Sequence, residues 1–128
     1  MDKIAQKKTS ELFEMTGTFF AFGDEQWSAK VVPDTHYTSC GAGMYCPTDT
    51  VAKMTITLNE IMKASNDREM LSRGLDGVIL DSLSNHECYY TGDVEDAVDD
   101  LAARHPQITL DDIQRVYRAN YDEAMERF

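Results

Sequence analysis

The sequence predicts an α+β fold that is mostly helical, with about four or five helices and a small sheet of two or three strands. Apolar residues recur at helical spacing over most of residues 48–124. A short aromatic run at residues 18–22 is typical of a strand. The chain has 128 residues, close to the usual size of one domain, so we expect a single domain over residues 1–128.

Residues 3–15 are predicted to form the first helix, which ends at Gly17. Three apolar side chains are expected on one of its faces: Ile4, Leu12 and Met15. The aromatic and β-branched residues 18–22 then favour a buried strand. Asp24 follows as the expected cap of a short helical turn.

Residues 32–47 are predicted to be irregular or extended, because prolines and glycines interrupt any helix there. The glycines at 41 and 43 indicate a turn, and a short strand ending at Pro47 follows it. This strand is expected to pair with the aromatic strand at residues 19–22.

Four helical segments are predicted in the rest of the chain. Residues 48–65 form a helix that is expected to end at Asn66-Asp67. Residues 68–85 continue with helical periodicity, although two glycines leave open a division into two shorter elements. The last two helices have apolar stripes at residues 94–102 and 110–124, and Thr109 is the expected cap of the second.

The charge of the chain is strongly acidic. It has 23 acidic and 12 basic side chains, a formal net charge of −11, and residues 87–128 alone hold 11 acids and 4 bases. Affinity for nucleic acid comes from lysine and arginine, so direct nucleic-acid binding is not expected. An acidic surface attracts basic partners, although acidic charge also serves simply to keep many proteins soluble.

Two groups of residues are candidates for binding a protein partner. Seven carboxylates are expected to project outward from the last two helices: Asp93, Glu95, Asp96, Asp99, Asp100, Asp111 and Asp112. Four aromatic residues are candidate anchors: Trp27, Tyr45, Tyr89 and Tyr90. The alternative is an ordinary solvated helix face, and Arg115 and Arg118 interrupt the second acidic stretch.

The segment Asn85–Asp93 is the most unusual stretch, because polar, titratable and aromatic groups crowd between two helical patterns. His86 and Glu87, together with His36, are candidates for lining a ligand pocket. The alternative is a structural junction with a buried histidine, packed tyrosines and a cap for the next helix.

The cysteines do not indicate a metal, cofactor or catalytic site. Three cysteines, Cys40, Cys46 and Cys88, suggest reduced thiols in a cytoplasm, since the N-terminus lacks the apolar core of a signal peptide. Zinc sites with histidine usually pair cysteines at shorter spacing than that of Cys40 and Cys46. A cysteine nucleophile would need a base and an oxyanion site, and the sequence identifies neither. We therefore expect a protein that is not an enzyme.

Three motifs together resemble a family of small uncharacterised proteins from bacteriophage and bacterial genomes. They are Phe19-Phe20-Ala21-Phe22 with Glu25-Gln26, Gly41-Ala42-Gly43-Met44-Tyr45 with Pro47, and Asn85-His86-Glu87 with Tyr89-Tyr90-Thr91-Gly92-Asp93. The resemblance spans about residues 10–120. It transfers no catalytic residues, and it implies a phage or mobile-element accessory protein that acts in the cytoplasm of a bacterial host.

Charge and resemblance together favour a non-enzymatic binder or inhibitor of a host protein complex. The phage context implies an anti-defence role against a CRISPR or restriction system. In that role the carboxylates of the acidic surface would imitate DNA phosphates and occupy a basic groove of the host protein. Two alternatives stay open. One is a small-molecule-binding protein or enzyme centred on residues 85–93, and the other is a self-associating assembly component.

Overall fold

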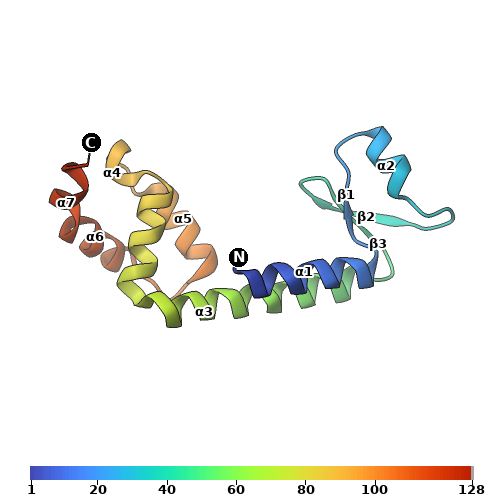
Figure 1. Cartoon of the computed structure of the whole chain (residues 1–128), viewed down its shortest axis with the longest axis horizontal. Coiled ribbons are helices and arrows are strands. Elements are labelled where there is room, and N and C mark those ends of the chain that lie inside the picture. The colour runs from blue at the N-terminus through green and yellow to red at the C-terminus, as the bar shows by residue number, and fades with distance from the viewer. Residues whose placement is uncertain (128) are drawn as a thin grey trace. The chain divides into compact units, whose positions relative to one another are not determined.

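The computed structural model describes residues 1–127 and confirms the predicted fold class (Figure 1). Within these residues the chain forms seven helices and a three-stranded antiparallel sheet. It divides into two compact units, Met1–Ser65 and Asn66–Phe128, each with a core of its own. The helix α3 (Val51–Asn85) contributes to both units, and the expected single domain stays a prediction.

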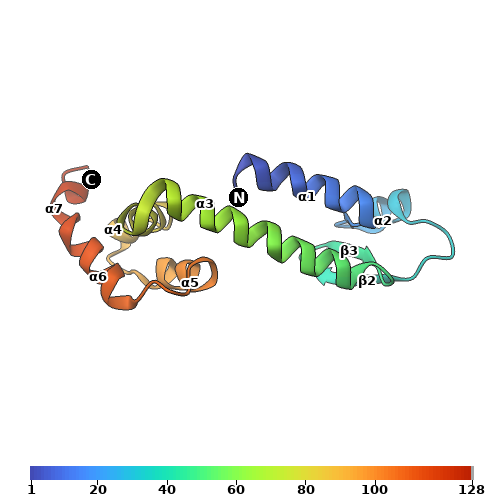
Figure 2. The same cartoon turned by 90° about the horizontal axis from the view of Figure 1, so that it is seen from below.

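The N-terminal unit contains the sheet. Its elements are α1 (Lys3–Thr16), β1 (Phe19–Phe20), α2 (Asp24–Lys30), β2 (Tyr37–Gly41), β3 (Met44–Pro47) and the first half of α3. Two hydrogen bonds show that α1 and α3 run antiparallel (Figure 2). The backbone N–H of Asp2 donates to Oγ of Ser65 (3.2 Å), and Oγ1 of Thr50 donates to the carbonyl of Thr16 (2.8 Å). The core of this unit consists of Ala5, Leu12, Cys46, Met54 and Ile61.

The ends of α1 follow from its sequence. Asp2 caps the helix by accepting the N–H of Ala5 (2.9 Å), and Gly17 ends it with a φ of 77°. The prediction that Asp24 caps α2 is wrong, because the capping position is Gly23 and Asp24 is the first helical residue.

The predicted apolar face of α1 is only partly correct. Leu12 is buried, whereas Ile4 is 52% and Met15 is 68% exposed. The face that packs against α3 instead carries the small residues Ala5 and Thr16 beside Leu12. Small side chains let two helices approach closely, and a hydrophobicity pattern does not report that preference.

The sheet has the strand order β1-β3-β2, so the predicted pairing of the aromatic strand with the strand after the glycine turn is confirmed. Phe19 pairs with Tyr45, and β2 occupies part of the segment expected to be irregular or extended. The predicted strand at residues 18–22 was too long and is not buried throughout, because Phe22 is 72% exposed.

A tight turn joins β2 to β3. Gly41 pairs with Met44, so only Ala42 and Gly43 lie between the strands. Their φ angles are 52° and 80°, as a type I′ hairpin turn requires. Gly43 suits this conformation, but Ala42 adopts it at a cost in conformational energy.

The C-terminal unit is entirely helical in the residues described. It contains the second part of α3, α4 (Cys88–Thr91), α5 (Glu95–Arg104), α6 (Leu110–Ala119) and α7 (Tyr121–Met125). The expected helix end at Asn66-Asp67 is wrong, because α3 continues without interruption until Gly74. Asn and Asp are only mildly unfavourable inside a helix, whereas Gly74 adopts a φ of 70° and a ψ of 172° and kinks it.

The core of the C-terminal unit lies between α3 and the helices that follow it. Its buried members are Val78, Ile79, Leu83, Cys88, Tyr89, Ala97, Leu101, Ile113 and Val116. Thr109 begins α6 with a reciprocal capping box to Asp112, which confirms the predicted cap. The single helix expected over residues 110–124 is instead interrupted at Asn120, whose side-chain amide donates to the carbonyl of Val116 (2.9 Å).

Candidate functional site

The predicted partner-binding carboxylates lie on and before α5 and at the start of α6. Five of the seven predicted residues are exposed: Asp93, Glu95, Asp96, Asp99 and Asp111. Asp93 also orders the chain before α5, because its Oδ1 accepts the N–H of Glu95 (2.9 Å). We call Asp93, Glu95, Asp96 and Asp99 the α5 acidic face.

Asp100 and Asp112 do not project freely as expected. Oδ2 of Asp100 accepts a hydrogen bond from Ser82 on α3 (2.7 Å), and Arg104 donates to both Asp100 oxygens (2.8 Å each). Asp112 is engaged in the capping box of α6. The hydrogen bonds from Arg104, with a smaller contribution from Ser82, lower the pKa of Asp100 to about 2. This half-buried carboxylate is therefore engaged by neighbouring helices of its own unit and does not project freely toward a partner.

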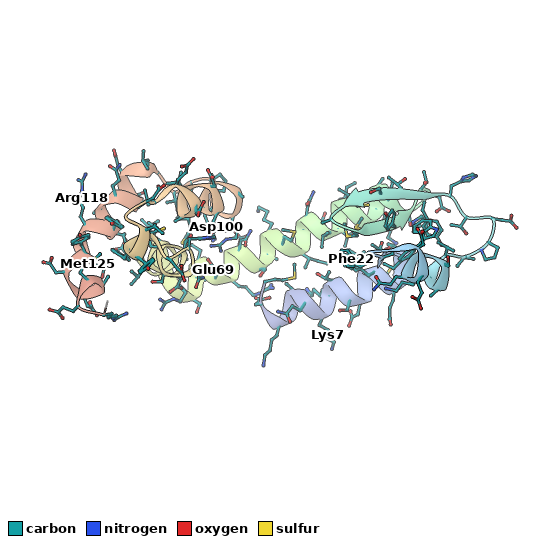
Figure 3. The ribbon with its side chains drawn as sticks, turned by 90° about the horizontal axis from the view of Figure 1, so that it is seen from above. Lys7, Phe22, Glu69, Asp100, Arg118 and Met125 are labelled. Atoms are coloured by element: carbon teal, nitrogen blue, oxygen red, sulfur yellow. The ribbon has the colours of Figure 1, made fainter. Side chains whose placement is uncertain are left out.

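Asp100 is part of a polar cluster that joins α5 to α3. Nη1 of Arg104 also donates to both carboxylate oxygens of Glu69 (2.6 and 2.7 Å). His105 is only 2% exposed, and its Nε2 lies 3.2 Å from Oε1 of Glu69. Figure 3 labels Glu69 and Asp100 within the C-terminal unit. The cluster fixes the position of α5 against α3.

The contributions of Glu69, Ser82, Arg104 and His105 to this cluster were not predicted from the sequence. They lie on two helices up to 36 positions apart, so no local motif connects them. Only the position of His105 gave an indication that it could be buried. It lies directly before the helix-ending Pro106 and shortly after the apolar positions of residues 94–102.

The arginines of the C-terminal unit are largely neutralised within it. Ion pairs within the unit include Arg73 with Asp81, Arg104 with Glu69 and Asp100, Arg115 with Asp76, and Arg127 with Glu123. Arg115 therefore interrupts the acidic surface less than the sequence suggested, since both of its terminal nitrogens bond Asp76 on α3 (3.1 and 2.7 Å).

The Asn85–Asp93 segment contains the short helix α4. Cys88 and Tyr89 are buried, and the Tyr89 ring stacks on Tyr117 with a centroid separation of 4.6 Å. The Tyr89 hydroxyl donates to the carbonyl of Tyr117 (3.0 Å), and burial raises its pKa. His86 is not the buried histidine of the structural alternative, because it is exposed and its Nε2 lies 3.7 Å from Asp100.

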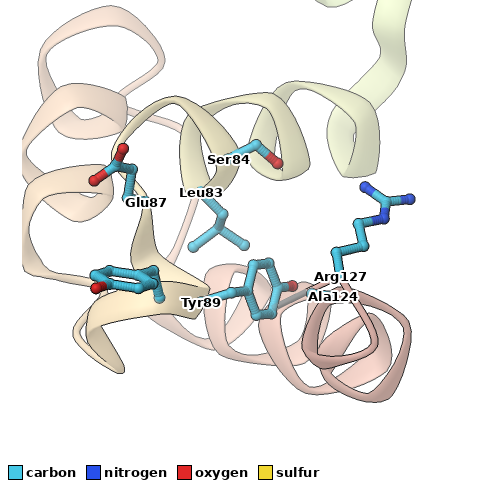
Figure 4. Close-up of a pocket in the computed structure, with 7 residues that line it drawn as sticks. Leu83, Ser84, Glu87, Tyr89, Ala124 and Arg127 are labelled. Atoms are coloured by element: carbon cyan, nitrogen blue, oxygen red, sulfur yellow. The ribbon is translucent and has the colours of Figure 1, made fainter.

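A pocket of about 410 Å³ lies beside this segment (Figure 4). It is lined by Leu83, Ser84, Glu87, Tyr89, Tyr90, Ala124 and Arg127. Glu87 and Arg127 flank it on opposite sides, with Leu83 between them. Glu87 adopts a left-handed conformation (φ 55°, ψ 33°), which is uncommon for a residue other than glycine.

Only part of the predicted ligand set meets at this pocket. Glu87, Tyr89 and Tyr90 line it, but His86 is directed toward Asp100 and is not among the lining residues. His36 is an exposed residue of the N-terminal unit. Arg127 was not predicted, since its place opposite Glu87 depends on the turn between α6 and α7.

The two aromatic anchors of the N-terminal unit do come together. Trp27 and Tyr45 make an edge-on contact with ring centroids 4.7 Å apart, and Phe19 and Tyr37 complete the group. These four rings lie on α2 and on all three strands, so only the sheet pairing assembles them. We call them the aromatic cluster.

The cysteines are free thiols, two of them buried. Burial is the main cause that raises the pKa of Cys88, and it also raises the pKa of Cys40. Within residues 1–127, no group of three or more His, Cys, Asp or Glu side chains is placed to hold a metal ion. In the same residues no helix has both the length and the apolar character needed to cross a membrane.

A protein-family model matches residues 1–124 of the chain, and its description is a family of unknown function, DUF7659. The chain belongs to this family. The DUF7659 match covers every candidate site residue except Arg127. It confirms the resemblance to an uncharacterised family, while the phage context stays a proposal. Neither the curated proteins nor the solved structures gave a match.

Proposed function

We propose that the protein is a non-enzymatic binding protein whose C-terminal unit engages a basic surface of a protein partner. The observation that carries this proposal is the distribution of charge. Residues 66–128 hold 15 acidic and 6 basic side chains, which is −9 of the net −11. The N-terminal unit, by contrast, holds all six lysines and is close to neutral.

The arginine ion pairs of the C-terminal unit involve carboxylates other than those of the α5 acidic face. Because Arg73, Arg104, Arg115 and Arg127 bond these other carboxylates, their charges are directed away from the α5 acidic face. None of the four side chains of that face forms an ion pair within the described part of the chain. Four adjacent carboxylates of this kind attract a basic surface over about 8–10 Å at moderate salt.

A nucleic-acid-binding protein is the partner class that fits this surface best. Such proteins carry lysine and arginine in grooves that hold phosphates, and exposed carboxylates along a helix compete for the same groups. The resemblance to phage and bacterial proteins supports a host defence complex, such as a CRISPR or restriction system, as the target. The action would be stoichiometric inhibition in the bacterial cytoplasm.

Substitutions that remove the negative charges of the α5 acidic face test this proposal. We would replace Asp93, Asp96 and Asp99 by Asn and Glu95 by Gln, which keeps the acceptor at position 93 that orders the start of α5. The control variant carries Gln at four exposed glutamates of the N-terminal unit: Glu11, Glu14, Glu25 and Glu60. Both variants change the net charge by the same amount.

Quantitative affinity capture from a bacterial lysate compares the three proteins. We expect the unmodified chain and the control variant to retain the same basic partner, and the α5 variant to lose it. Equal loss in both variants would show that only net charge matters, and equal retention would show that the acidic face has no role. Circular dichroism of each variant confirms that the helices remain.

A second candidate function is small-molecule binding at the Glu87–Arg127 pocket. The observation that favours it is the placement of a carboxylate and a guanidinium on opposite sides of an apolar centre (Figure 4). This arrangement complements a ligand with both an ammonium and a carboxylate, such as an amino acid. Ligand-observed NMR with the common amino acids tests it, and binding that Glu87→Gln leaves unchanged would argue against this site.

A further inference from the structure

The N-terminal unit also has a pocket, which is open to solvent, has a volume of about 580 Å³ and lies beside the aromatic cluster. It is lined by Ala21, Phe22, Gly23, Asp24, Trp27, Gly43 and Tyr45. Three of these are aromatic, one is a carboxylate, and the others are glycine or alanine. Small residues let a ligand approach the rings, so the chemistry of the pocket comes from three aromatic rings and one negative charge.

The rings of this pocket are held in place by the surrounding structure. The backbone N–H of Phe22 donates to Oε1 of Gln26 (2.9 Å), and the N–H of Ala21 donates to the carbonyl of Gly43 (2.9 Å). The Phe22 ring packs directly on Gly43, where an added Cβ would lie 2.4 Å from the ring. Trp27 is fixed by its contacts with the aromatic cluster. The site is therefore formed before any ligand arrives.

The charge of this pocket is negative and uncompensated. Asp24 is the only charged lining residue, and its carboxylate forms no hydrogen bond or ion pair within residues 1–127. The nearby lysine of α2, Lys30, donates to the carbonyl of Phe20 (2.5 Å) and does not line the pocket. Aromatic ring faces are also negative, so the carboxylate and the rings favour a cation and disfavour an anion.

We propose that this pocket receives an arginine side chain of a protein partner. A planar guanidinium stacks on an aromatic face while donating two parallel hydrogen bonds to a carboxylate, which the compact, strongly hydrated lysine ammonium does less well. The inference rests on the proposed function, because it specifies one contact with a basic partner. It places that contact on the N-terminal unit, whereas the α5 acidic face belongs to the C-terminal unit.

Trp27 is the only tryptophan of the chain, so its fluorescence reports on this pocket directly. The probe is the peptide acetyl-Gly-Arg-Gly-amide, titrated into the full chain. Its matched control contains citrulline, which has the shape of arginine without the charge. We expect a saturable change in Trp27 emission with the arginine peptide, and binding at least about fivefold weaker with the citrulline peptide.

Two substitutions at the start of α2 locate the charge that is responsible. Asp24→Asn should weaken arginine binding at least about fivefold. Glu25→Gln removes the neighbouring exposed carboxylate, which does not line the pocket, and should leave binding unchanged. Because Gly23 occupies the capping position without a side-chain hydrogen bond, neither change removes a cap from α2. Phe22→Leu should also weaken binding, since it removes one exposed ring.

The inference would be overturned by no saturable change with the arginine peptide, by equal binding of the citrulline peptide, or by equal effects of Asp24→Asn and Glu25→Gln. Equal binding of a lysine peptide would contradict recognition of the guanidinium. These measurements need no partner protein. If the arginine peptide does not bind, the arginine pocket is refuted, but the role of the α5 acidic face is still tested by its own variants. If the affinity capture shows no role for the α5 acidic face, the pocket is still tested by the fluorescence of Trp27.

Discussion

Replacing Asp100 by Asn should destabilise the protein in a manner that depends on pH. The pKa of this carboxylate is lowered from 3.8 to about 2 in the folded protein. A difference of nearly two pKa units corresponds to about 2.4 kcal/mol of stabilisation at neutral pH. The side chain is 24% exposed, so solvent screening reduces the expected loss to about 1–2 kcal/mol.

The sign of the pH dependence follows from the lowered pKa. The stabilisation from Asp100 is complete above its unfolded-state pKa of about 3.8, and it disappears as the pH falls through about 2. The unmodified protein and the Asn variant should therefore differ most near pH 7 and converge toward pH 2. Urea unfolding followed by circular dichroism over this range measures the difference.

Asp99→Asn is the matched control, because Asp99 is exposed on the same helix and forms no ion pair within the described residues. Its unfolding free energy should stay close to that of the unmodified protein at every pH. If Asp100→Asn is as stable as Asp99→Asn at pH 7, then the cluster with Arg104 does not stabilise the fold. A loss that persists unchanged at pH 2 would mean that packing, and not the ionised carboxylate, is responsible.

Three further measurements follow from local structure. Ala42→Gly should raise the unfolding free energy by about 1 kcal/mol, because Ala42 has a φ of 52°, and urea unfolding tests this change. Thr109→Ala should lower that free energy by about 1 kcal/mol through loss of the capping box, while Thr109→Ser should retain it. A thiol reagent should label the partly buried Cys40 in the native protein before the buried Cys46 and Cys88, and all three cysteines should react in denaturant. Rapid native labelling of Cys88 would contradict its burial.

Features with a local cause could be predicted from the sequence. The Thr109 cap and the glycine at the end of α1 depend on residues within one helical turn, and both are present. The pairing of the aromatic strand with the strand after the glycine turn was also correct. The extent of α3 could not be predicted, because Asn66 and Asp67 are only mildly unfavourable inside a helix and do not end this one.

The candidate sites depended more on tertiary structure. Exposure of the α5 acidic face could be inferred from its position opposite a buried stripe. The inward orientation of Asp100 could not be inferred from the sequence, because it depends on hydrogen bonds from Ser82 and Arg104, which lie on two different helices. Likewise, the pocket beside Asp24 exists only once α2 and the strands bring Phe22, Trp27 and Tyr45 together.

The most direct test of the central claim is the salt dependence of binding to a purified partner obtained with the unmodified protein. If the α5 acidic face carries the interaction, Kd should rise at least about tenfold between about 0.05 and 0.3 M salt. The variant with Asn or Gln at the four positions of the face should show a weaker Kd with a shallower salt dependence. A Kd that does not change with salt, or an equal salt dependence in that variant, would contradict the account.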